Sequence, residues 1–300
     1  MTPSSSRILA AAFATCFTLH AVDAAAQAKT TLVIKEGQPL DGKINGNPVR
    51  FKMKANGIAY PILNPDVASR LKLRSNIFSV VAVIGPVKVP GKTGVAKIEA
   101  SGSSFKHRIL WFERPTTTQA SATLSPESVP QQVIRFELRE PVAGEKLTRM
   151  PLVRKDFTLN VVQTAGGQDI FVQFDPDLAK SMATAGAANV IGGEHGGQLS
   201  GATYSTPYYF GVERPLRTVQ LATPFRIGPL SLSSFSARVS DLGAISNLPD
   251  ADLDPNEVLV TASRSKVKPI YRIILGADAL ENCSSITFDK PRKVIELSCR

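Results

Sequence analysis

The most constraining feature of this chain is a short motif near its C-terminus that returns, blurred, midway along the sequence. Residues 273–280 read Ile-Ile-Leu-Gly-Ala-Asp-Ala-Leu, and residues 285–289 read Ser-Ile-Thr-Phe-Asp. An apolar run that ends at a glycine, followed by a short helical pattern and an alternating run, predicts a strand, a tight turn, a helix and a second strand. The motif predicts a β-rich scaffold, but it carries no catalytic group.

The earlier copy is less regular. Residues 122–129 read Ala-Thr-Leu-Ser-Pro-Glu-Ser-Val and lead to an alternating run at residues 133–137, with Ser125 where the C-terminal copy has Gly276. In both copies a strand leucine precedes a phenylalanine at nearly the same spacing, namely Leu124 and Phe136 in the first copy and Leu275 and Phe288 in the second. Equivalent spacing in two parts of one chain favours an internal duplication.

Short apolar and β-branched runs separated by turn residues occupy most of the chain and predict an all-β fold with a few short helices. Asn45-Gly46 lies between two such runs and predicts a tight hairpin, because both residue types accept the positive φ angles of that turn. Helices are predicted at residues 64–71, capped by Asn64, and at residues 178–188.

A polar stretch that contains Pro and Gly, residues 139–146, predicts a connector between two domains. We therefore divide the chain into a first lobe at residues 29–138, a linker at residues 139–156 and a second lobe at residues 157–300. Each lobe is long enough to bury a core of its own.

Residues 1–28 predict an export signal. One early positive charge at Arg7 precedes an apolar stretch at residues 8–22, and the small-residue run Ala-Gln-Ala that ends at Ala28 is typical of signal peptidase cleavage. The apolar stretch is shorter than a membrane-spanning helix needs. We therefore expect a periplasmic or secreted protein, cleaved near Ala28 and without a transmembrane segment after cleavage.

The predicted signal contains one arginine and one aspartate, so the mature chain keeps the net charge of +10. Lys and Arg residues occur singly along strand-like runs, as at Arg50, Lys52 and Lys54, without a basic helix or interleaved aromatic residues. This pattern argues against nucleic-acid binding. The glycine-rich residues 192–197 lack the Gly-Lys-Ser/Thr sequence of a phosphate-binding loop, and no cofactor is predicted.

Two cysteines, Cys283 and Cys299, remain after cleavage of the signal. An oxidising compartment favours a disulfide between them that fastens the last strand. Two thiols without a neighbouring histidine pattern make a poor zinc site, so no metal site is predicted.

Three segments resemble the retropepsin-like aspartic protease family, in particular its exported bacterial members. Residues 45–51 resemble the hairpin that runs into the active-site strand, residues 63–68 resemble the helix after the active-site loop, and residues 274–280 look like the family's apolar-apolar-Gly strand with its helix. The likeness covers most of residues 43–138 and, more loosely, residues 157–297. It implies two tandem retropepsin-like β-barrel lobes.

In that family an Asp-Thr/Ser-Gly loop from each lobe brings two carboxyl groups together, and the pair shares a proton and activates a water molecule. Here the first position is Lys54, in the run Lys-Ala-Asn-Gly, and the second is Asp175, in the run Asp-Pro-Asp. If the lobes meet as in the family, Lys54 faces Asp175, and we expect the ammonium to lower the pKa of that carboxyl group. The resemblance thus implies a degenerate active site.

Other candidates lie in or near these loops. Asn56 and Asp177 are expected to contribute to binding in the cleft, and Asp177 is also interpreted as an acidic cap on the helix that follows. The pair Glu194-His195 lies in a glycine-rich segment, which predicts a mobile loop comparable to a flap, with His195 as a binding residue or an ordinary surface residue.

We therefore expect an exported, catalytically inactive pseudoprotease that binds an extended peptide or protein ligand in the cleft between its lobes. Two alternatives stay open. One is an active aspartic endopeptidase that uses Asp175 in a rearranged or dimeric site, and the other is a structural envelope protein without a ligand. A serine hydrolase is not favoured, because the sequence has no Gly-x-Ser-x-Gly elbow.

Overall fold

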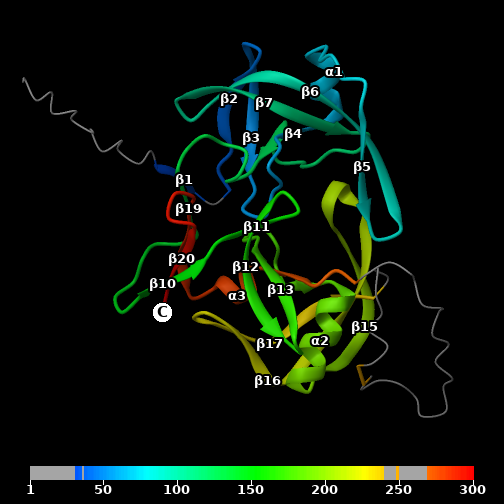
Figure 1. Cartoon of the computed structure of the whole chain (residues 1–300), viewed down its shortest axis with the longest axis vertical. Helices are drawn as coiled ribbons and strands as arrows, with labels where there is room; N and C mark the ends of the chain where they lie inside the picture. Colours follow the sequence, from blue (N-terminus) through cyan, green and yellow to red (C-terminus); the bar gives the residue numbers. More distant parts are fainter. Residues whose placement is uncertain (1–30, 36, 240–247, 250–268) are drawn as a thin grey trace, which may run out of the picture.

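A computed structural model describes residues 31–35, 37–239, 248–249 and 269–300. Within these ranges the chain is mainly strand, with three α-helices and one turn of 3-10 helix, which confirms the all-β prediction. The two halves lie one above the other, and β1, β19, β20 and β10 run together along one side of them (Figure 1). The predicted signal at residues 1–28 and its cleavage point lie outside the described residues.

The elements of the first half, in chain order, are β1 Thr31–Lys35, β2 Leu40–Ile44, β3 Asn47–Met53, β4 Ile62–Leu63, α1 Pro65–Arg70, β5 Ser79–Ile84, β6 Val87–Ala100, β7 Ser103–Phe112, β8 Ala122–Leu124 and β9 Val133–Glu137. Those that follow are β10 Lys146–Pro151, β11 Val153–Lys155, β12 Thr158–Ala165, β13 Gln168–Phe174, β14 Met182–Ala183, α2 Ala185–His195, β15 Gln198–Pro207, η1 Tyr209–Gly211, β16 Glu213–Ile227, β17 Leu230–Arg238, β18 Arg272–Leu275, α3 Ala277–Leu280, β19 Cys283–Asp289 and β20 Val294–Cys299.

The sheet of the first half closes on itself. Its strand order is β2-β3-β8-β4-β7-β6-β5, and an additional pairing of β2 with β6 completes a barrel. The long strand β6 pairs with β2 through residues 98–100 and with β5 through residues 87–92, so β5 continues past the barrel as one arm of a hairpin. Among the described strands β5 has no second neighbour and forms the edge of this sheet.

The second half repeats this pairing order. The spatial order of its strands, β13-β18-β14-β17-β16-β15, matches the order β3-β8-β4-β7-β6-β5 of the first half. The pairs β3–β8 and β13–β18 are both parallel, β8–β4 and β18–β14 are both antiparallel, and β4–β7 and β14–β17 are both parallel. The helices follow equivalent strands, with α1 after β4 and α2 after β14. The two copies of the C-terminal motif, at β8 and β18, occupy matching places in these sheets.

A third sheet, in the order β1-β9-β19-β20-β10, joins the halves. Its centre is the antiparallel pair β9–β19, in which Ile134 lies opposite Phe288 and Phe136 lies opposite Ile286. The rings of Phe136 and Phe288 are 5.9 Å apart between centroids and meet edge to face. Backbone pairing and buried apolar side chains therefore hold the halves together.

The helix predicted at residues 178–188 is displaced toward the C-terminus, and the prediction of a mobile glycine-rich loop after it is wrong, because residues 185–195 form α2. Helix α2 begins after Thr184, whose hydroxyl accepts a hydrogen bond from the Ala187 N–H, and ends at Gly196 in the left-handed conformation. Gly186 and Gly192 of this helix serve close packing, since a Cβ would lie 3.0 Å from the Ile270 carbonyl oxygen at Gly186 and 2.5 Å from the Leu248 side chain at Gly192. Glycines in this segment therefore indicate close contact with neighbouring residues and not a mobile loop.

Other local predictions had mixed outcomes. The Asn45-Gly46 hairpin between β2 and β3 is confirmed, with φ angles of 49° and 82°. Asn64 does precede α1, but its side chain makes no cap bond and instead donates to the carbonyl oxygens of Thr117 and Ala120, at 2.8 and 3.1 Å. The linker expected at residues 139–156 contains β11 and β10, and β10 pairs with β20 along its whole length.

The predicted disulfide between Cys283 and Cys299 is confirmed, and the two residues face each other across β19 and β20. Disulfides are typical of proteins outside the reducing cytoplasm. Near them, Glu145 accepts hydrogen bonds from the hydroxyls of Ser284 and Ser298, at 2.5 and 2.8 Å. The bond from Ser284 is the main reason that the pKa of Glu145 falls to about 2. No helix within the described ranges is long and apolar enough to cross a membrane.

Replacing Cys283 and Cys299 together with serine should lower the free energy of unfolding by about 2–4 kcal/mol, because the crosslink limits the unfolded chain. Urea denaturation of the oxidised protein and the double variant measures the difference. Reductant should bring the wild type to the stability of the variant and leave the variant unchanged. Equal stability of the oxidised protein and the variant would contradict the structural role of the bond.

Candidate functional site

Two short loops face each other where the halves meet. One follows β3 and begins at Lys54, whose N–H donates to the Leu124 carbonyl of β8 at 2.8 Å. The other follows β13 and begins at Asp175, whose N–H donates to the Leu275 carbonyl of β18 at 2.9 Å. Each loop then closes with the same backbone bond, three residues on, at 3.1 and 3.0 Å. Lys54 and Asp175 therefore occupy equivalent positions.

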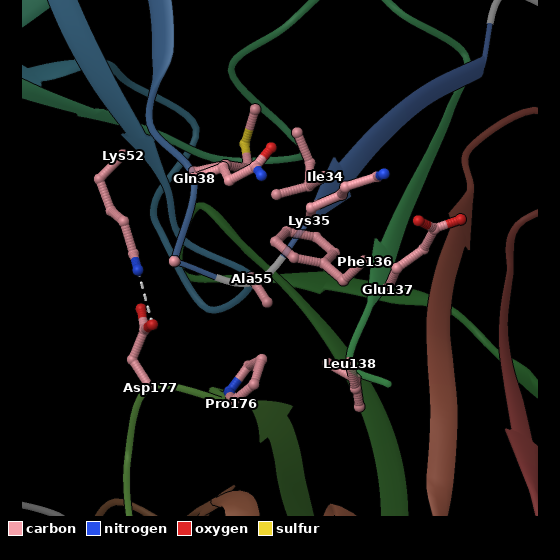
Figure 2. Close-up of a pocket in the computed structure, with 12 residues that line it drawn as sticks. Ile34, Lys35, Gln38, Lys52, Ala55, Phe136, Glu137, Leu138, Pro176 and Asp177 are labelled. Atoms are coloured by element: carbon pink, nitrogen blue, oxygen red, sulfur yellow. Dashed lines mark hydrogen bonds and ion pairs between the residues drawn. The ribbon is translucent and has the colours of Figure 1, made fainter. Parts of the chain in front are cut away.

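Four charged side chains, three from these loops and one from β3, form one cluster. Lys54 Nζ lies 3.4 Å from Asp175 Oδ2 and 3.8 Å from Asp177 Oδ2. Lys52, within β3, binds Asp177 Oδ1 at 2.7 Å (Figure 2). The cluster contains two cations and two anions, so its formal charge is balanced.

Burial decides the protonation behaviour of Asp175. The residue is only 7% exposed, and loss of hydration raises its pKa above the ordinary value. The ammonium of Lys54 and its hydrogen bond act in the opposite direction but do not outweigh burial. Lys54 therefore acts in the expected direction, but the expectation that the pKa of Asp175 is lowered is wrong, because it left out the cost of burying the carboxylate.

The interpretation of Asp177 as a helix cap is also wrong. Helix α2 begins eight positions later, and Asp177 instead binds Lys52. Lys52 was not among the candidate residues, although its alternation with Lys54 along a strand places both side chains on one face. Asn56 is buried, and its side-chain Oδ1 has no hydrogen-bond partner among the described residues.

A segment of the second half lies against the loop of the first half. In the turn η1, between β15 and β16, the hydroxyl of Tyr209 donates to the Asn56 carbonyl at 3.2 Å. Burial raises the pKa of this tyrosine well above its ordinary range. The next residue, Phe210, packs against Phe112 of β7 with 4.5 Å between ring centroids. The sequence offered no signal for this contact, which joins residues about one hundred positions apart along the chain.

The tip of the β5–β6 hairpin contacts the same part of the second half. Gly85 has a φ of 59°, and a Cβ at this position would lie 2.5 Å from Nη2 of Arg214 in β16. Ile84 and Val89 of the hairpin pack in one apolar cluster with Val212. The two hairpins therefore meet at their tips and cover the region beside Lys54.

Two cavities flank the charged cluster and differ greatly in size. The one in Figure 2 lies between β1, β9 and Pro176 and has a volume of about 20 Å³, room for a single water molecule (Figure 2). The other lies under the β5–β6 hairpin and has a volume of about 660 Å³, within the usual range for ligand sites. Its lining includes Lys54, Tyr209 and Phe210.

His195 and Glu194 are not brought to this cluster. His195 is the last residue of α2, where its ring meets that of Phe225 and its Nδ1 lies 3.3 Å from the Thr223 hydroxyl. Glu194 accepts a hydrogen bond from the Gly166 N–H. No group of three or more His, Cys, Asp or Glu residues in the described ranges is placed to hold a metal ion.

The exchange of serine and glycine between the two motif copies has a steric reason. In the first half a Cβ at Gly57 would lie 2.8 Å from Cβ of Ser125, so the loop residue must be small. In the second half the loop residue is Leu178, and a Cβ at Gly276 would collide with its carbonyl oxygen and lie 3.0 Å from the Ser181 nitrogen. The Ser125 side chain thus leaves no room for a Cβ at Gly57, and the backbone of residues 178–181 leaves no room for a Cβ at Gly276.

Comparison with known proteins gives a partial likeness. No protein-family model matches the chain, and no curated protein matches it. Among solved structures, the chain is similar to one described as "EIAV protease complexed with the inhibitor HBY-793", with 21% identity and a TM-score of 0.23 over 29% of this chain and 80% of that one. At this coverage the likeness assigns no activity to the chain.

Gly276→Ala should lower the free energy of unfolding by about 1–3 kcal/mol, because the added methyl group meets backbone atoms that cannot move aside alone. Gly193→Ala is the matched control, since it lies in α2 with no atom within 4 Å of the added Cβ. That variant should be neutral or slightly more stable. Thermal and urea denaturation of both variants give the comparison, and equal effects would contradict the steric account.

The raised pKa of Asp175 predicts a pH dependence of stability. Between the pKa of an unfolded aspartate, about 3.9, and the higher folded value, the folded chain binds more protons than the unfolded chain. The stability of the wild type relative to Asp175→Asn should therefore fall as pH rises from about 4 and level off above the folded pKa. Urea denaturation at stepped pH measures it. A relative stability that rises over this range would mean that Lys54 outweighs burial.

Proposed function

We propose that this is an exported protein built from two tandem protease-like lobes, in which an ion pair has replaced the acid dyad and the cleft binds peptides without cleaving them. The lobes correspond to residues 29–138 and 157–300, joined by residues 139–156 and preceded by a signal at residues 1–28. The observation that carries the proposal is the 3.4 Å contact between Lys54 Nζ and Asp175 Oδ2 at equivalent loop positions.

The chemistry of this pair differs from that of two carboxyl groups. Two like charges at close range cannot both ionise, which leaves one acid and one base on a shared proton. A lysine beside an aspartate has no such conflict, because the two charged forms attract each other. Asp177, the nearest second carboxylate in the cluster, is already bound by Lys52. A water molecule in this site lacks the acid and base pair that a dyad supplies.

The shape of the region supports binding. The matching order of strands in the two sheets and the central β9–β19 pair are what two duplicated lobes would produce. A cavity large enough for several side chains of a ligand is lined mainly by the first half, with Phe157, Tyr209 and Phe210 contributed by the second. Apolar clefts with a few polar groups are the usual place for ligands in proteins.

The alternative hypothesis is that the protein is an active endopeptidase that depends on Asp175. The raised pKa of this buried carboxyl favours it, since catalytic acids often have such values. The two readings differ in whether cleavage requires Asp175.

Digestion of casein and of a mixed peptide library at pH 3 to 7 separates the two readings. The purified mature protein should give no cleavage above the level of Asp175→Asn, because no shared proton is available to activate water. Asp169→Asn, an exposed change on the same strand, controls for contaminating protease and for handling. Cleavage that Asp175→Asn abolishes and Asp169→Asn retains would falsify the pseudoprotease proposal.

A further inference from the structure

The large cavity follows an unprotected strand edge. Residues 80–84, five consecutive positions of β5, all line it, so it runs along the backbone of that strand and not only along one of its faces. In the described sheet β5 pairs with β6 alone, which leaves the N–H and C=O groups of its other edge outside the sheet.

This edge has none of the usual defences against pairing. Residues 75–84 contain no charged residue and no proline. Large apolar side chains are exposed along it, with Ile77 at 99%, Phe78 at 75%, Val81 at 54% and Val83 at 58%. Proteins normally place charges, prolines or bulges on such edges, so an edge without them is suited to receiving another strand.

The charge of the lining is one-sided. Among the described residues that line the cavity, two are charged, Lys54 and Arg108, and both are cations. Lys54 is already bound to Asp175 and Asp177. Arg108, on β7, donates to the Thr93 hydroxyl at 3.2 Å and has no carboxylate within ion-pair distance among the described residues. The remaining lining is apolar or bears hydroxyl groups, so the cavity complements an apolar ligand with one acidic group.

Arg108, two strands away from β5 across β6, lines the same cavity, and the register places it level with one end of β5. Arg108 lies opposite Val95 on β6, and Ser79, the first residue of β5, lies opposite Lys92. The guanidinium-bearing residue is therefore level with a position three residues before β5 begins. A strand added antiparallel to β5 would run toward this end and finish there.

We propose that the cavity binds the apolar C-terminal segment of a polypeptide as an added strand antiparallel to β5, with its terminal carboxylate bound by Arg108. The inference rests on the proposed peptide-binding function and defines which peptides the cleft accepts. The edge of β5 supplies hydrogen bonds to the peptide backbone, and the sheet face around Leu110 and Phe112 contacts alternate apolar side chains of the peptide. Arg108 binds the terminal carboxylate. A fatty acid would satisfy the apolar lining and Arg108 but would leave the edge of β5 unused.

Fluorescence anisotropy at pH 7 with N-terminally labelled Ser-Gly-Ser-Val-Thr-Val-Ile-Val tests the proposal. The free acid should bind about tenfold more tightly than the C-terminal amide, because a charge-assisted hydrogen bond is lost in the amide. Methylation of alternate amide nitrogens in the probe should abolish binding, since it blocks strand addition. Replacing its apolar residues with serine should also abolish binding.

Three variants test which residues cause the effect. Arg108→Gln should weaken the acid probe about tenfold and leave the amide probe unchanged. Lys106→Gln is the matched control, because it removes a positive charge from an exposed residue of the same strand that does not line the cavity. Val81→Asp places a carboxylate on the exposed edge and should weaken the acid probe further than the amide. Unchanged melting temperatures show that the variants fold.

The outcomes separate this inference from the proposed function. If peptides bind with no preference for the acid and Arg108→Gln has no effect, the inference is overturned and peptide binding stands. If no peptide binds, both are overturned and a structural role is favoured. If decanoate displaces the probe at the same concentration as the unlabelled acid peptide, the ligand is an amphiphile and the peptide proposal is overturned.

Discussion

The antiparallel pairing of β9 with β19 fixes the position of every other feature between the halves. β9 belongs to the first half of the chain and β19 to the second, and their backbone hydrogen bonds set the register of one half against the other. Because Ile134 lies opposite Phe288 and Phe136 lies opposite Ile286, the apolar residues of the two motif copies share one buried layer. The loops after β3 and β13 meet beside this pairing, and the contacts of Lys54 with Asp175 and Asp177 join them.

Because the two loops lie so close together, the charges of their side chains decide whether the site can share a proton. Two carboxyl groups held together would have to share a proton, whereas Lys54 and Asp175 can be charged at once. Burial still acts on the pair and raises the pKa of Asp175. The adjacent pair of Lys52 and Asp177 extends the cluster to four residues, and removing any one of them would leave a partner charge in a poorly hydrated place.

Sequence patterns predicted what local physics controls. The Asn45-Gly46 turn, the disulfide and the meeting of Lys54 with Asp175 were all expected, because turn geometry, compartment chemistry and the repeated motif each constrain them. Helix α2 was misplaced because its alanines and glycines carry little periodic signal and are chosen by the surfaces they touch. The contact of η1 with the first half joins residues far apart along the chain, so local sequence patterns could not predict it.

The close contact at each loop-strand junction limits how the two halves can change. In the first half the Ser125 side chain leaves no room for a Cβ at Gly57, and in the second half the backbone of residues 178–181 leaves no room for a Cβ at Gly276. Copying the first motif over the second would therefore press a serine side chain against this backbone, and copying the second loop over the first would press a leucine side chain against Ser125. The halves are free to diverge from each other, but an exchange of these single residues between them creates a steric clash.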